Sequence, residues 1–214
     1  MTCHQSIIAT VIRGHLGCLK HAHVNGHKLG SNITSFAAEY GRLECLMYAH
    51  DNGCEWAPKT TYYAACKGHL ECLRYAHENG CEWHPETTRI AAHNGQLDCL
   101  KYAHESPGVS CKWHPETTWL AVDSGQLECL QYAHENGCEW HPKTTYTAAR
   151  HGELECLMYI YEKCGDVVTW EDADLEENFI SFPKKIQDYI DSVREDWKCG
   201  LNRSGMRTKS AMRN

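Results

Sequence analysis

The chain has 214 residues, of which 23% are charged and 42% are hydrophobic. This balance is typical of folded proteins and argues against a disordered chain. The formal net charge of −7 disfavours non-specific binding to nucleic acid or to anionic membranes, so we expect neither as a partner. No stretch approaches the 18 apolar residues that a membrane-spanning helix needs.

The cysteine content bears on the compartment. The chain has 14 cysteines. The first residues, "MTCHQSIIATVIRGHLGC", lack the charged region and the long apolar run of a secretory signal peptide. Cysteines without such a signal are typical of a reducing compartment, where thiols stay free or bind metal. We therefore expect an intracellular, cytoplasmic protein.

An internal repeat dominates the sequence. The segment "ECLRYAHENGCEWHPETT" at 71–88 returns at 128–145 as "ECLQYAHENGCEWHPKTT". The shared Gly-x-Leu-x-Cys-Leu element recurs six times, at Cys18, Cys45, Cys72, Cys99, Cys129 and Cys156. The spacings are 27, 27, 27, 30 and 27 residues, and the longer one comes from extra residues in the loop 105–111. So regular a period predicts a repeat architecture.

Each repeat is predicted to form two short helices. In "HPETTRIAAHNG" at 84–95, Pro85 suits the first helical position and Glu86 complements the positive helix start. Two alanines then allow close packing, and Gly95 supplies a left-handed stop. The second helix is predicted over "QLDCLKYAHE" at 96–105. Its apolar stripe is wide, which indicates a helix packed between two neighbours.

These features predict an all-α solenoid of stacked helix-turn-helix repeats with capping helices at both ends. Residues 1–169 form the array of about six repeats. Residues 170–197 keep the helical spacing but lose the motif, so they are predicted to be degenerate C-terminal capping helices. Residues 198–214 contain five basic residues and no acidic one, and they are predicted to be a disordered basic tail.

The repeats resemble ankyrin repeats. "GHLECLRYAHENGC" at 68–81 is similar to the second helix and exit of that family, and "IAAHNG" at 90–95 to the end of its first helix. The resemblance covers about residues 5–165. Ankyrin repeats have about 33 residues, so these shorter units lack the β-hairpin. Threonine pairs replace the Thr-Pro-Leu-His tetrapeptide of the family: Thr87-Thr88, Thr117-Thr118 and Thr144-Thr145.

The chain is most similar in style to the short, Cys/Trp-rich ankyrin-like arrays common in giant viruses and some protists. If the protein comes from a virus, we expect it in the cytoplasm of the host cell. The resemblance implies protein binding and not catalysis. It also places first helices on the concave side of the array, where partners commonly dock.

The recurring Cys and His residues allow a metal site or a packing role. Cys72 and His77 lie about 140° apart around one helix, so they cannot easily share an ion. Cys81 and His84 form at most half a site, and Ala57 replaces the histidine in another copy. Cys81 follows a helix-ending glycine, where packing against Ala76 is expected. We therefore predict no metal and no cofactor, and keep a Cys/His metal-binding or redox protein as an alternative.

Disulfides between repeats and metal binding by a histidine cluster are two further possible roles of these residues. Equivalent cysteines in neighbouring repeats should lie about 8–10 Å apart, beyond the limit of about 7 Å between Cα atoms for a disulfide. The cysteine row of the second helices falls where ankyrin repeats have valine. One histidine cluster could still chelate a metal adventitiously: His4, His15, His21, His23 and His27.

Catalysis finds little support in the sequence. No Gly-x-Ser-x-Gly, His-Glu-x-x-His or phosphate-binding loop occurs. Cys–His pairs are present in many copies, which favours architecture over one activated nucleophile. We expect no enzyme and assign no catalytic residue.

Comparison between copies separates packing positions from candidate binding positions. Positions that are identical between copies hold the stack, whereas positions that vary can specify a ligand. The variable first-helix positions predicted to bind a partner are Tyr62, Arg89, Trp119, Tyr146, Tyr40, Lys67, His93, Asp123 and Arg150. Tyr, Trp and Arg are enriched at interface hot spots. The alternative is that Tyr62, Trp119 and Tyr146 fill the space left by the missing Leu-His of the tetrapeptide.

A second row of aromatic residues scarcely varies. It comprises Trp56, Trp83, Trp113 and Trp140. We interpret this row as a structural ladder on the loop side.

The predicted function is therefore a non-enzymatic, monomeric scaffold that binds another protein along its concave face. An alternative is a substrate adaptor, because "FPKKIQDYI" at 182–190 faintly resembles the start of F-box-like segments that recruit ubiquitin ligases. Only Pro183, Ile186 and Ile190 match, and a capping role for these residues is the competing interpretation.

Overall fold

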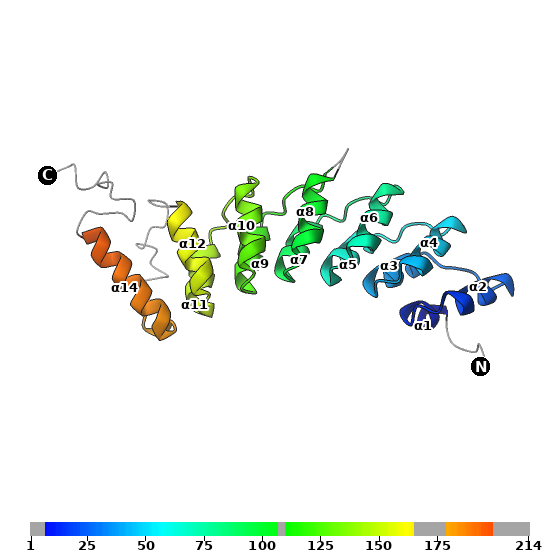
Figure 1. Ribbon diagram of the computed structural model, residues 1–214, viewed down its shortest axis with the longest axis horizontal. Helices are drawn as coiled ribbons and strands as arrows, with labels where there is room; N and C mark the ends of the chain where they lie inside the picture. Colours follow the sequence, from blue (N-terminus) through cyan, green and yellow to red (C-terminus); the bar gives the residue numbers. More distant parts are fainter. Residues whose placement is uncertain (1–6, 107–109, 165–178, 199–214) are drawn as a thin grey trace. The chain divides into compact units, whose positions relative to one another are not determined.

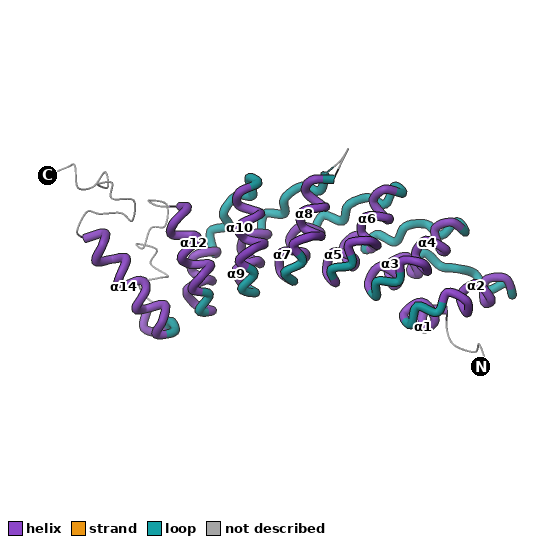
Figure 2. Tube along the Cα trace, viewed as in Figure 1, coloured by secondary structure: helices purple, strands orange, loops and turns teal. Residues whose placement is uncertain are grey.

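The computed structural model describes residues 7–106, 110–164 and 179–198. Throughout these residues the regular elements are helices and no strand occurs (Figures 1 and 2). The chain divides into two compact units, residues 1–141 and residues 142–214. We describe each unit by itself. None of the described helices has the length and apolar character needed to cross a membrane.

Unit 1 contains helices in consecutive pairs (Figure 1). The pairs are α1 (Ile7–Ile12) with α2 (Leu16–Val24), α3 (Asn32–Glu39) with α4 (Leu43–Asp51), α5 (Thr60–Lys67) with α6 (Leu70–Glu78), α7 (Thr87–His93) with α8 (Leu97–Glu105), and α9 (Thr117–Asp123) with α10 (Leu127–Glu135). The predicted helix-turn-helix repeat without a hairpin is thus confirmed in the described residues. Successive first helices pack much more closely than successive second helices. The first helices therefore line the inner side of this unit.

Unit 2 contains the last repeat and a C-terminal helix. Its elements are α11 (Thr144–His151), α12 (Leu154–Cys164), a short 3₁₀ turn (Phe179–Ser181) and α14 (Lys184–Lys198). Phe182, Ile186, Ile190 and Val193 are buried along α14 and the turn before it. Gly152, which ends α11, is close enough to the ring of Pro183 that a Cβ there would lie 3.1 Å from it. The remainder of the predicted cap, 170–178, and the tail 199–214 lie outside the described residues.

The helix starts differ from the prediction. The first helix of the fourth repeat begins at Thr87, and Pro85 and Glu86 form the turn before it. The hydroxyl of Thr87 donates to the carbonyl of His84 at 2.8 Å, and its amide donates to the same oxygen at 3.0 Å. Placing Pro85 at the first helical position was therefore wrong. The turn is closed by the threonine, which returns two hydrogen bonds across it.

The helix ends agree with the prediction. Gly95 has a φ of 67°, the left-handed conformation expected there. At the end of the second helix, the amide of Gly80 donates to the carbonyl of His77 (3.1 Å) and that of Cys81 to the carbonyl of Ala76 (2.9 Å). This pair of bonds is the Schellman motif. Cys54 and Cys138 occupy the same position of this motif in their repeats, and His27 occupies it in the first repeat.

The glycine that ends a first helix also lies close to a side chain of the next repeat. A Cβ on Gly68 would collide with the amide oxygen of Gln96, which comes from the next repeat. A Cβ on Gly95 would collide in the same way with Gln126. The left-handed backbone conformation requires glycine at these positions, and the flexible glutamine side chain of the next repeat lies directly against it.

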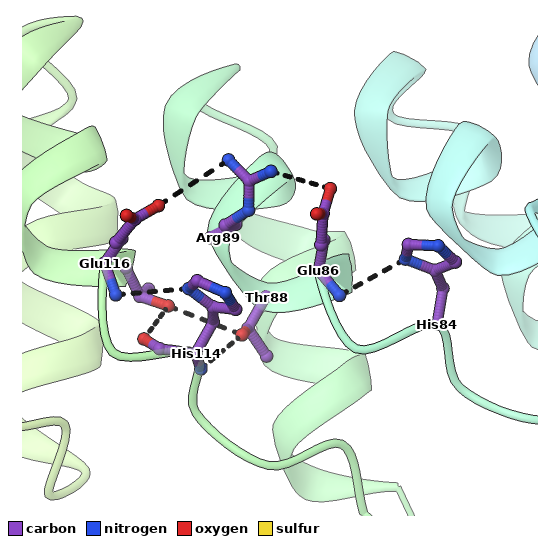
Figure 3. Close-up of polar contacts among 7 residues, drawn as sticks. His84, Glu86, Thr88, Arg89, His114 and Glu116 are labelled. Carbon is purple, nitrogen blue, oxygen red and sulfur yellow. Dashed lines mark hydrogen bonds and ion pairs between the residues drawn. The ribbon is translucent and has the colours of Figure 1, made fainter.

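In unit 1, the second threonine of each pair joins one repeat to the next, as Thr88 does in Figure 3. The buried hydroxyl of Thr88 accepts a hydrogen bond from the amide of His114 (3.0 Å) and donates to the carbonyl of Lys112 (3.3 Å). Thr61 and Thr118 make the equivalent two bonds one repeat earlier and one repeat later. The threonine pair that replaces the ankyrin-like tetrapeptide is therefore an inter-repeat contact.

The tryptophan row forms the predicted structural ladder. The ring of His77 stacks on Trp83 with centroids 4.5 Å apart, and its Nδ1 lies 3.1 Å from the hydroxyl of Tyr102 in the next repeat. His50 and His104 make the same two contacts. The indole N–H groups of two members donate to the next repeat, Trp56 to the carbonyl of Asn79 and Trp113 to that of Asn136, each at 3.0 Å.

Replacing Thr88 by valine should lower the free energy of unfolding by about 1–3 kcal/mol, because the amide of His114 loses its buried acceptor. Urea denaturation of the full chain measures this loss. Thr88→Ser, which keeps the hydroxyl, should recover most of it. Equal stability of the two variants would contradict the inter-repeat role of the hydroxyl.

Candidate partner-binding surface

The first helices divide their residues between two faces. On α7, Thr87, Thr88, Ala91 and Ala92 are fully buried, whereas Arg89 and the residues near it on the other face are partly accessible. The equivalent division occurs on α5 and α9. We call the accessible side in unit 1 the first-helix surface. It comprises Tyr40, Tyr62, Lys67, Arg89, His93, Trp119 and Asp123.

Exposure varies along this surface. Tyr62, Arg89 and Trp119 are half-buried, and so are His93 and Asp123. Tyr40, which is 41% exposed, and Lys67 lie at the ends of their helices and face solvent. The first-helix surface therefore has half-buried side chains along its helices and exposed ones at the helix ends.

Arg89 holds two repeats together (Figure 3). Its guanidinium pairs with Glu86 at 2.6 Å on the preceding turn and lies 3.9 Å from Glu116 of the next repeat. Its Nε is buried and has no hydrogen-bond partner. Two carboxylates share this one cation, so Arg89 does not act as a free positive charge. Sequence reasoning singled out Arg89 but missed both glutamates, although each stands just before a threonine pair.

Tyr62 is held by aromatic contacts. Its ring lies edge-on to His84, with centroids 5.2 Å apart, and the ammonium of Lys59 lies 5.6 Å from the ring centre. His84 is itself oriented, because its Nδ1 accepts a hydrogen bond from the amide of Glu86 at 3.2 Å. Burial lowers the pKa of His84, which keeps that nitrogen an acceptor at neutral pH.

Trp119 is held in a similar way. Its indole stacks on the ring of His141 with centroids 5.3 Å apart and planes 22° apart. A half-buried aromatic side chain fixed by its neighbours loses little entropy on binding. Both interpretations, partner binding and gap filling, therefore apply to Tyr62 and Trp119. Each ring packs against the fold, and part of it remains accessible.

Two predicted binding residues lie in unit 2. Arg150 is exposed. Tyr146 is half-buried, and its ring packs edge-on against Phe182, with centroids 6.1 Å apart. This contact supports the gap-filling interpretation for Tyr146.

Most cysteines in the described residues are buried, whereas Cys18 and Cys66 are half-buried. Burial raises the pKa of Cys81 and Cys111 to about 11, and that of Cys99 and Cys129 to about 12. Such thiols remain protonated at neutral pH, which makes them poor nucleophiles and poor ligands. The thiol of Cys81 lies 3.7 Å from the carbonyl of Glu82 as a weak donor.

Several histidines use a ring nitrogen within the protein, whereas the buried Nδ1 of His93 has no hydrogen-bond partner. His77 bonds Tyr102 and His84 accepts from Glu86, so neither histidine is directed to its nearby cysteine. In the N-terminal cluster, His21 contacts Asn25 and His23 contacts Tyr48, while His4 lies outside the described residues. Across the described part of the chain, no group of three or more His, Cys, Asp or Glu residues is arranged to hold a metal ion.

Comparisons with known proteins agree with this geometry. No protein-family model matches the sequence, and no curated protein matches it. Among solved structures, 70 chains match, including the human ASB11 ankyrin repeat domain. That match has a TM-score of 0.65 and 16% sequence identity, and it covers 86% of this chain and 96% of that one. This chain has an ankyrin repeat fold.

The ankyrin fold confirms the predicted all-α solenoid. The structure also shows what takes the place of the β-hairpin and of the Thr-Pro-Leu-His tetrapeptide that these repeats lack. In the described residues, each second helix leads to the next first helix through a loop without strands. The threonine hydroxyls hold that loop to the preceding layer. A giant-virus or protist origin stays a prediction.

The buried thiols predict a pH dependence of stability. Their pKa values in the fold lie above the ordinary value of 9.0, so the unfolded chain loses these protons first. The contribution of the thiols to the free energy of unfolding should therefore be constant below about pH 8 and fall as the pH rises above about 9, by up to about 1.4 kcal/mol per pH unit for each thiol. Urea denaturation between pH 7 and pH 10 measures this slope.

A single substitution provides the control for this slope. Cys99→Val keeps an apolar side chain of similar size and removes one ionisable group, so the decline should become shallower. Stability that is unchanged up to pH 10 would contradict the burial of the thiols.

Proposed function

We propose that this chain is a non-enzymatic scaffold that binds another protein on its first-helix surface. The supporting observation is the division of each first helix between two faces. Threonines and small apolar residues repeat on the buried face, while tyrosine, arginine and tryptophan occupy one equivalent position on the accessible face. A requirement for stacking alone would favour the same residue in every layer. Variation that is larger on the accessible face than on the buried face supports recognition of a particular partner.

The types of side chain support the same proposal. Tyr62 and Trp119 are amphipathic aromatic anchors that their histidine neighbours hold in place. Such residues commonly contribute most of the binding energy of an interface, and truncating one typically costs more than about 1 kcal/mol. The ion pairs of Arg89 stiffen the helix between them. Together these residues form a rigid strip across three consecutive repeats.

The absence of enzymatic activity is part of this proposal. Raised pKa values keep the buried thiols neutral, and the nearby histidine nitrogens are engaged in hydrogen bonds with the protein. An activated nucleophile needs the opposite, a lowered pKa or a base directed at it. The described chemistry therefore supports a binding protein.

The alternative adaptor function has less support. Ile186 and Ile190 are 0% and 1% exposed, and Pro183 contacts the region of Gly152 within unit 2. These are the residues that resemble an F-box-like segment, and their burial leaves them unavailable to a ligase subunit. Capping of the last repeat accounts for their chemistry, so we favour that role.

Site-specific photo-crosslinking tests the proposed surface. A benzophenone amino acid placed at position 62 or 119 should crosslink a partner in cells. The same amino acid at Met47, which is 39% exposed on the second helix α4, serves as the control and should not. Equal crosslinking from all three positions, or crosslinking from position 47 alone, would contradict the proposal.

Substitutions measure the contribution of the surface once a partner has been crosslinked. Tyr62→Ala and Trp119→Ala should each weaken binding at least about fivefold, which corresponds to about 1 kcal/mol. Circular dichroism and urea denaturation should show that each variant is folded. Met47→Ala should leave the affinity unchanged.

A further inference from the structure

Unit 1 contains a groove that is separate from the first-helix surface. It lies between the loops 80–85 and 110–115 of two consecutive repeats and has a volume of about 760 Å³. Its walls are mainly apolar and include Trp83, Pro85, Trp113 and Pro115. None of the first-helix surface residues lines it. A volume of this size accommodates one or two side chains of a bound peptide.

The two indoles that line the groove are fixed in place. His77 stacks on Trp83 and His104 stacks on Trp113, with centroids 4.5 and 4.4 Å apart. Both tryptophans are nevertheless only half-buried, because they also line the groove. Tryptophan is the aromatic residue that attracts a cation most strongly. The groove therefore presents two preorganised π-systems from neighbouring layers.

Exposed acidic residues surround this side of unit 1. In unit 1, the second helices α4, α6, α8 and α10 each end in an exposed acidic residue. Three of the four loops that follow these helices carry another acidic residue. These residues are Asp51, Glu78, Glu105 and Glu135 on the helices and Glu55, Glu82 and Glu139 in the loops. Glu82 lines the groove, and so does Lys112, the base at the equivalent loop position of the next repeat. The nearby Arg74 and Lys101 lie over the rings of Tyr102 and Tyr132.

The placement of the helical acids adds to the negative potential. A helix C-terminus already carries a partial negative charge, so an acid in the last turn opposes the helix dipole. Some of these acids are stabilised by a tyrosine of the next repeat, as Glu105 is by Tyr132 at 2.7 Å. The carboxylates and the carbonyl ends of the second helices therefore lie on the same side of unit 1. This side is electrostatically complementary to a cation.

We propose that the groove binds an arginine or lysine side chain from a basic segment of a partner protein. The apolar walls receive the methylene stem, the indoles of Trp83 and Trp113 contact the cationic group, and the carboxylate of Glu82 pairs with it. The surrounding acids attract the basic residues that flank this side chain. The site does not depend on the proposed function of the first-helix surface.

Fluorescence anisotropy with a defined probe tests this site. The probe is a labelled nonapeptide of alternating arginine and serine, titrated with the full chain at low salt. Its counterpart has citrulline in place of arginine, which keeps the shape and removes the charge. The arginine peptide should bind and the citrulline peptide should bind at least about tenfold more weakly, because only the former offers a cation. Equal binding of the two peptides, or no binding of either, would overturn the proposal.

The repeat supplies a matched control. Glu82→Lys and Glu55→Lys change the same charge at the same position of neighbouring repeats, and both positions are exposed. Only Glu82 lines the groove. Glu82→Lys should weaken binding of the arginine peptide at least about fivefold and Glu55→Lys less than about twofold, because exposed charges that do not touch the ligand contribute little. Equal weakening by the two variants would show diffuse attraction only and would reject the groove.

Two further measurements identify the occupant. The indole N–H signals of Trp83 and Trp113 should shift in NMR spectra on addition of the peptide, and unchanged signals would contradict binding between them. Removal of residues 199–214, which carry basic residues, should leave the affinity unchanged. A higher affinity after that removal would show that the chain's own tail occupies the groove and would overturn assignment to a partner.

Discussion

The buried threonine hydroxyl that joins a first helix to the loop of the next repeat is the contact on which this array depends. A repeat of two short helices cannot bury its own apolar stripe, so its stability comes from its neighbours. The hydroxyl of Thr88 satisfies both a backbone donor and a backbone acceptor of the following loop. That loop then needs no strand to pair its buried polar groups. The short period of the repeat follows from this solution.

The aromatic ladder performs the corresponding task on the outer side. His50, His77 and His104, at the ends of their second helices, each link the tryptophan of their own repeat to the tyrosine of the next. Successive first helices pack closely, whereas successive second helices lie farther apart. Aromatic rings therefore bridge the space between the second helices of neighbouring repeats. Cysteine suits the buried face of the second helix, because a small thiol packs closely and stays neutral when buried.

Once stacking is secured by a few repeated positions, the others are free to differ. On the inner side, that freedom places Tyr62, Arg89 and Trp119 at one equivalent position in successive layers. In the loops, it leaves Glu82 and Lys112 on neighbouring rims of one groove. The two surfaces differ in chemistry, since one is aromatic with neutralised charge and the other has two indoles beside Glu82 and Lys112, with further exposed carboxylates around them. A scaffold of this kind can present them independently.

The sequence by itself determined the period, the paired helices and their ends, because a 27-residue repeat, helical spacing and glycine stops are local properties of the chain. It also identified the tryptophan row as structural, since that row scarcely varies between copies. The start of the first helices was misjudged, because the bonds that close the turn come from Thr87 and not from Pro85. Only the tertiary structure showed that Arg89 is neutralised by Glu86 and Glu116, that Tyr146 packs on Phe182 and that a groove separates Trp83 from Trp113. These features join residues of different elements, and the distance between neighbouring layers is set by packing that no single repeat encodes.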